Sequence, residues 1–144
     1  MPDSSSKMGI QDNVIAARFF TQMGHLTAIL VLISTIENNV EKGLEDGESS
    51  SAALASCNWA LALGTIAMFF DFSGMFFGNS LFSNYMNMTQ ILFHATGSIF
   101  LSWLITQNWH YDTLWPIIIC TNFPTAIIEV GIILAVYVFK ISAL

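Results

Sequence analysis

Four ionisable side chains lie inside long apolar stretches of this sequence, one in each stretch. They are two imidazoles and two carboxylates: His25, Asp71, His94 and Glu129. At about 1.5 Å per helical residue, the first three lie roughly 10 Å inside the expected boundary of their stretch, and Glu129 lies about one turn deeper. We therefore expect an intramembrane polar layer that takes one residue from each of four helices.

Polar residues on the same helical faces support this arrangement. In the third stretch they recur every four positions, which gives one polar stripe along an otherwise apolar helix. We expect supporting polar contacts from six residues: Arg18, Gln22, Gln90, Ser98, Asn122 and Thr125. We expect close helix packing or a helix kink at four others: Gly64, Gly74, Gly78 and Pro124. The Arg18 side chain lies at a depth from which it is predicted to reach the lipid headgroups.

The polar layer has three chemical interpretations. Its members can pair and fix which helix faces which, they can form a proton or ion path, or they can bind a metal ion. Pairing is favoured, because imidazoles and hydroxyls nearly match the two carboxylates and the sequence has no internal repeat. Neither E-x-x-H nor H-x-x-x-H occurs, and no nucleophile lies at motif spacing from a base. The sequence therefore predicts no metal, no cofactor and no enzyme activity.

The elements that must position these residues are transmembrane helices. Of the 144 residues, 54% are hydrophobic and 10% are charged, and the mean hydropathy of +0.62 is typical of an integral membrane protein. Four Lys and Arg residues in all are too few for a nucleic-acid-binding surface. We expect four spans at about 14–36, 52–77, 89–106 and 114–139, after a disordered segment 1–13 and before a short tail 140–144.

The short connections between these spans predict a four-transmembrane-helix antiparallel bundle of the all-α class. An acidic segment, Glu37–Ser51, is expected to form a solvated loop between the first two spans. Three basic residues lie on the side of both termini: Lys7, Arg18 and Lys140. The opposite side carries only Lys42. The positive-inside rule therefore predicts that both termini are cytosolic.

Several segments resemble the transmembrane protein 107 family in order and spacing. They are Arg18-Phe19-Phe20-Thr21 through His25-Leu26, the turn from Gly78 to Phe82 leading to Gln90 and His94, the segment Trp109 to Trp115, and Pro124-Thr125-Ala126 through Glu129. The family's histidines match His25 and His94, its intramembrane acids match Asp71 and Glu129, and its fourth-span proline matches Pro124. Two features depart from the family: its second-span acid is usually a glutamate, and the acidic loop differs.

The resemblance implies a multi-pass protein with cytosolic termini at the transition zone of the cilium, where the family belongs to the Meckel syndrome group. It implies two kinds of partner, the lipid bilayer and other transition-zone membrane proteins of that complex, while assembly into an oligomer stays open. The chain is therefore predicted to be a non-enzymatic scaffold that helps assemble the ciliary gate and restricts ciliary membrane composition. The alternative is a small proton- or ion-linked transporter, or an oligomeric channel, that uses the polar layer.

Overall fold

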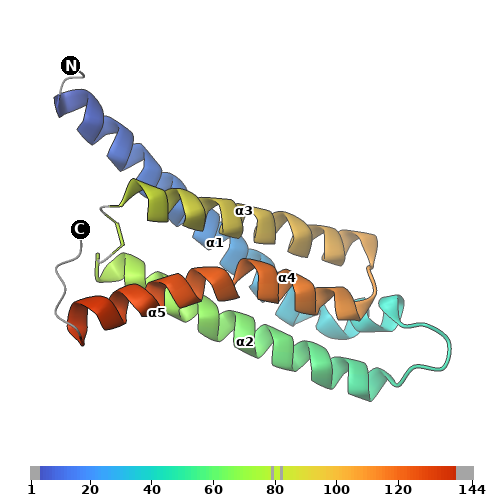
Figure 1. Ribbon diagram of the computed structural model, residues 1–144. Coiled ribbons are helices and arrows are strands. Elements are labelled where there is room, and N and C mark those ends of the chain that lie inside the picture. The colour runs from blue at the N-terminus through green and yellow to red at the C-terminus, as the bar shows by residue number, and fades with distance from the viewer. Residues whose placement is uncertain (1–3, 79, 82, 139–144) are drawn as a thin grey trace.

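The computed structural model describes residues 4–78, 80–81 and 83–138 and shows a bundle of helices (Figure 1). Their order is α1 (Ser4–Gly43), α2 (Ser50–Phe76), α3 (Asn84–Gln107), the short 3-10 helix η1 (Tyr111–Thr113), α4 (Leu114–Thr121) and α5 (Phe123–Tyr137). Within the described residues, four stretches are long and apolar enough to cross a membrane: 13–43, 50–76, 84–107 and 111–137. The predicted all-α class with four transmembrane helices is confirmed, and the predicted tail 140–144 lies outside the described residues.

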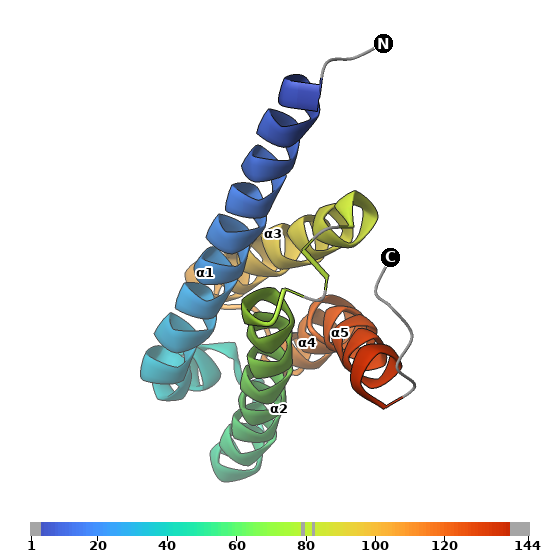
Figure 2. The ribbon, with the colours of Figure 1, turned by 90° about the vertical axis from the view of Figure 1, so that its left-hand side faces the viewer.

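The helices run antiparallel and pack into one bundle. α1 packs mainly against α3, α2 packs against α5, and α4 contacts both α2 and α3. Figure 2 shows the first turns of α1 extending past the other helices. α1 begins and α5 ends at the same end of the bundle, which we name the terminal end (Figure 1). The connection between α1 and α2 lies at the opposite end, which we name the loop end.

The first helix is longer at both ends than the sequence predicts. It begins at Ser4, within the segment predicted to be disordered, because extending a helix is much cheaper than nucleating one. It ends at Gly43, so the prediction of a loop over Glu37–Ser51 is wrong for the first half of that segment. Asn39 and Val40 are buried there, which shows that this turn of α1 packs against the bundle. Only residues 44–49 connect α1 to α2.

The third helix also begins earlier than predicted, at Asn84 instead of Thr89. Its first turn is stabilised from inside, because the Asn87 side chain is fully buried and hydrogen-bonded. The helix ends at Gln107, since Asn108 takes the left-handed conformation at φ 50°. Asparagine is among the few residues that adopt this conformation readily, so it suits the end of a helix.

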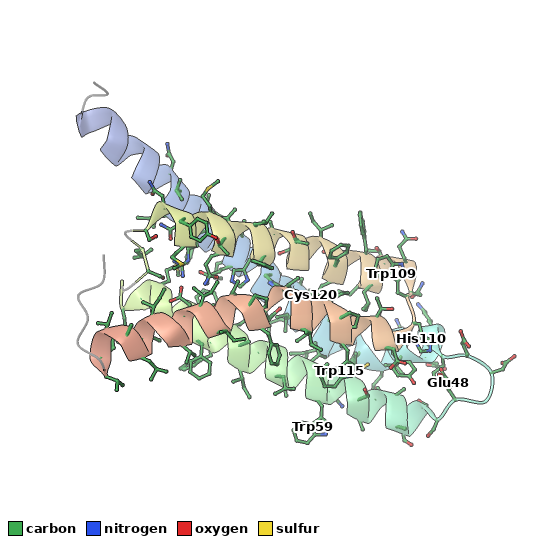
Figure 3. All side chains as sticks on the ribbon, in the orientation of Figure 1. Glu48, Trp59, Trp109, His110, Trp115 and Cys120 are labelled. Carbon is green, nitrogen blue, oxygen red and sulfur yellow. The ribbon has the colours of Figure 1, made fainter. Side chains whose placement is uncertain are left out.

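The interior of the bundle is divided along its length. The half near the loop end holds the apolar core, whose fully buried members include Ile29, Leu32, Leu101 and Ile118. The half near the terminal end holds buried polar side chains from α1, α2, α3 and α5. Large apolar side chains such as Trp59 point outward (Figure 3). Because lipid tails offer no hydrogen bonds, the polar half has to satisfy its polar atoms within the bundle.

Contacts at the loop end join the α1–α2 connection to the connection between α3 and η1. The Glu48 carboxylate lies 3.1 Å from Nε2 of His110, and Figure 3 shows both residues at this end. The backbone N–H of Glu45 donates to the Glu48 carboxylate and, together with His110, lowers the pKa of that carboxyl. Nearby, Nε1 of Trp115 donates to Oγ of Ser56 at 2.8 Å and joins α4 to α2.

We predict that Gly43→Ala lowers the melting temperature of the purified protein in detergent. A β-carbon at Gly43 would lie 2.6 Å from the backbone oxygen of Trp109, which cannot rotate away. Overpacking of this kind lowers the free energy of unfolding by about 1–3 kcal/mol. Gly131→Ala is the matched control, because a β-carbon there meets nothing within 4 Å. Equal melting temperatures for the two variants would contradict the close approach at the loop end.

Candidate functional site

The centre of the polar half is an ion pair between α1 and α5. Nη2 of Arg18 donates to Oε1 of Glu129 at 2.6 Å, and both side chains are fully buried. The prediction that Arg18 reaches the lipid headgroups is therefore wrong. Its guanidinium turns inward because Glu129 offers an opposite charge there, and a buried carboxylate without a partner is costly.

Arg18 also binds the α2–α3 turn. Its Nη1 donates to Oγ of Ser80 and to Oδ1 of Asn87, both at 2.9 Å. Ser80 in turn donates to Oε1 of Glu129 at 2.7 Å, and Nδ2 of Asn87 donates to the carbonyl of Leu81 at 2.7 Å. One guanidinium therefore joins three segments of the chain. Sequence reasoning missed Ser80 and Asn87, because they lie in a segment that was expected to be a turn.

The four predicted ionisable residues lie in one connected network with Arg18. Nε2 of Gln90 donates to Oε1 of Glu129 at 3.1 Å, and Oε1 of Gln90 lies 2.8 Å from Nε2 of His94. The two imidazoles meet through Nδ1 of His25 and Nδ1 of His94, which are 3.0 Å apart. Asp71 is adjacent, with its Oδ2 3.5 Å from Nε2 of His94. All of these side chains are buried.

Thr125 and Asn122 connect Asp71 and α2 to the break in the fourth span. Oγ1 of Thr125 lies 2.8 Å from Oδ2 of Asp71, within hydrogen-bond distance, and Nδ2 of Asn122 donates to the carbonyl of Gly64 at 3.2 Å. The fourth span is divided at Asn122, two residues before Pro124, which has no N–H to continue the ladder of backbone bonds. At this break, Asn122 and Thr125 both contact α2.

Glycines make room for the largest polar groups. A β-carbon at Gly74 would overlap the Glu129 carboxylate, and one at Gly97 would overlap the His25 ring. The sequence points to Gly74 as a packing residue but gives no signal for Gly97, because its partner depends on which face of α1 meets α3. Gly78 instead takes φ 73° in the turn after α2, where glycine is favoured.

Two predicted supporting residues stand outside the hydrogen bonds of this network. Ser98 donates to the carbonyl of His94 in its own helix at 2.8 Å. Gln22 is fully buried on the same face of α1 as Arg18 and His25, but its amide bonds to none of the described residues. Within the described part of the chain, no group of three or more His, Cys, Asp or Glu side chains has an arrangement that could hold a metal ion. The hydrogen bonds between side chains of α1, α3 and α5 can hold these helices together and share protons.

We predict that Arg18→Met and Glu129→Leu each lower the free energy of unfolding by about 3–5 kcal/mol, because each breaks the buried ion pair and leaves the remaining member without its direct hydrogen-bond partner. The double variant removes both charges and is expected to recover most of this loss. Unfolding of the reconstituted protein in graded denaturant measures all three values.

Lys42→Met is the control for this comparison, since it removes an exposed charge at the loop end. A change within about 0.5 kcal/mol is expected for it. Small and additive effects of the two single substitutions would show that Arg18 and Glu129 do not form a buried pair.

Comparison with known proteins agrees with this architecture. A family model described as "Transmembrane protein", TMEM107, matches residues 14–133, which include Arg18 and Glu129. Transmembrane protein 107 of Rattus norvegicus is 29% identical over 140 residues, covering 92% of this chain and 97% of that protein. The Mus musculus and Homo sapiens proteins of the same name are 28% and 24% identical, with the same coverage. No solved structure matches this chain. The chain is a multi-pass membrane protein that belongs to the transmembrane protein 107 family.

Proposed function

We propose that this chain is a non-enzymatic membrane scaffold of the ciliary transition zone. In this role it helps to assemble the gate complex of the Meckel syndrome group and restricts which membrane proteins pass between the cilium and the plasma membrane. Membership of the transmembrane protein 107 family supports the proposal. Both termini are cytosolic in this proposal, with the acidic loop end on the opposite side of the membrane.

The observation that carries the proposal is a group of exposed aromatic side chains on a firmly held turn. Phe76, Phe77 and Tyr85, which we name the turn patch, are 79%, 67% and 77% exposed and flank the α2–α3 turn. In a membrane-spanning chain exposed apolar side chains ordinarily contact lipid, and a group of aromatic side chains at the end of a span is also suited to contact a partner. Because Ser80 in the same turn binds both Arg18 and Glu129, the network holds the patch in place. A scaffold needs such a surface in a fixed position.

The contacts of the polar half favour a scaffold over transport. A transporter or channel would use His25, Asp71, His94 and Glu129, the residues that the sequence also proposes as an ion path. Here these side chains are bonded to one another and to neighbours from α1, α3 and α5. The result is a network that joins the helices, as expected if these side chains pair to fix which helix faces which.

We predict that a tagged full-length copy concentrates at the ciliary base and co-purifies with other transition-zone membrane proteins. Phe77→Ala combined with Tyr85→Ala is expected to reduce that co-purification about tenfold, which corresponds to the loss of about 1.4 kcal/mol of contact free energy. Both side chains are largely exposed and make none of the hydrogen bonds of the network, so the melting temperature in detergent is expected to stay unchanged.

The matched control replaces two equally exposed aromatic residues of α2 away from the turn, Trp59→Ala with Phe69→Ala. This variant is expected to co-purify with other transition-zone membrane proteins to the same extent as the wild type. An even distribution of the tagged wild-type protein over the plasma membrane, with no band at the ciliary base, would overturn the proposed function.

A further inference from the structure

The charges of the buried network do not balance. Arg18 carries one positive charge, whereas Asp71 and Glu129 carry two negative charges when both are ionised. All three side chains are fully buried in helices that cross the membrane. A net charge in such a place is unfavourable, because neither lipid nor the protein interior solvates it as water does. One additional proton makes the network neutral.

Glu129 is less suited than Asp71 to take this proton, although its Oε2 has no partner among the described residues. Its Oε1 accepts hydrogen bonds from Arg18 at 2.6 Å, from Ser80 at 2.7 Å and from Gln90 at 3.1 Å. Arg18 also donates to Oγ of Ser80, so the Ser80 hydroxyl hydrogen is free to point toward Glu129. An oxygen that receives three donors, one of them a guanidinium, is that of an ionised carboxylate.

The hydrogen bonds of the two imidazoles are those of a neutral pair, in which Nε2 of His25 has no partner among the described residues. The amide nitrogen of Gln90 faces Glu129, so its oxygen faces Nε2 of His94, and that nitrogen must carry a hydrogen. Nδ1 of the neutral His94 ring is then an acceptor. Because Nδ1 of His25 lies 3.0 Å away, it carries the hydrogen that the two rings share. Neither ring needs a second proton to complete these bonds.

Asp71 has the surroundings of a protonated acid. Its Oδ2 lies 2.8 Å from Oγ1 of Thr125, and that hydroxyl also lies 2.9 Å from the carbonyl oxygen of Asn122. A protonated Asp71 donates to the Thr125 hydroxyl, which then donates to Asn122. Among the described residues, the one side-chain amide that donates to Asp71 is that of Gln90, whose Nε2 lies 3.5 Å from Oδ1, too far for a strong bond. Asp71 therefore lacks the strong donors that hold Glu129 ionised.

We propose that Asp71 is a proton-binding site, which holds one proton taken from the aqueous phase and so neutralises the network at neutral pH. The groups that face it are Arg18 and His25 from α1, His94 from α3 and Glu129 from α5. Nε2 of His94, which carries its hydrogen toward Gln90, lies 3.5 Å from Oδ2 of Asp71. This site is independent of the proposed scaffold function.

Infrared spectroscopy of the full chain in liposomes tests the site directly. At neutral pH the exposed acids are ionised, so a carbonyl stretching band of a protonated carboxylic acid that shifts in heavy water reports the buried proton. We expect this band in the wild type and its loss in Asp71→Asn. Asp112→Asn, which changes an exposed acid at the loop end, is expected to keep the band. Absence of the band in the wild type, or its survival in Asp71→Asn, would overturn the proposal.

A second variant tests whether Asp71 is protonated because the charge of Arg18 is already balanced by Glu129. In Glu129→Gln the charges of Arg18 and Asp71 cancel without an additional proton, so the band is expected to disappear although Asp71 is still present. Retention of the band in folded Glu129→Gln protein would contradict the proposal. The wild-type spectrum needs no substitution, so the test stands even if this variant fails to fold.

Discussion

A buried guanidinium inside a membrane bundle is the constraint on which the rest of this structure depends. Arg18 can stay in the interior only if its charge is paired there and its terminal nitrogens find acceptors. Glu129 supplies the charge, while Ser80 and Asn87 supply further acceptors from the turn and from α3. The ion pair and hydrogen bonds of this one side chain therefore fix the positions of α1, α3, α5 and the turn that joins α2 to α3.

The division of the interior into two halves follows from the same constraint. The apolar half can pack in several ways at similar free energy, because dispersion contacts between aliphatic side chains are not directional. The polar half accepts fewer alternatives, because its hydrogen bonds are directional and a lost bond cannot be replaced by one to water. Gly74 and Gly97 show how closely this half is fitted, because each faces a polar group that a methyl group would displace. The polar half thus selects one arrangement of helices that the apolar half stabilises.

Helical periodicity was sufficient to predict four spans and to place His25, Asp71, His94 and Glu129 near one another, because depth and face follow directly from residue spacing. It could not predict the partner of Arg18. The partner of Arg18 depends on the rotation of α1 about its axis and on the conformation of the α2–α3 turn, which only the tertiary structure determines. The arginine is nevertheless the sole one in the chain, and a single cation in a span opposite an unpaired carboxylate is a signal that could have indicated the pair.

The contact between Arg18 and Glu129 can be measured directly by solid-state NMR of the protein in lipid bilayers. Because Arg18 is the only arginine, labelling arginine with nitrogen-15 marks one guanidinium, and carbon-13 at the glutamate carboxyls marks its partner. The Nη2–Oε1 distance of 2.6 Å predicts a strong nitrogen–carbon coupling that is lost in Glu129→Gln. Coupling of the guanidinium to lipid phosphorus instead, with none to a carboxyl carbon, would show that Arg18 reaches the headgroups and would contradict the account.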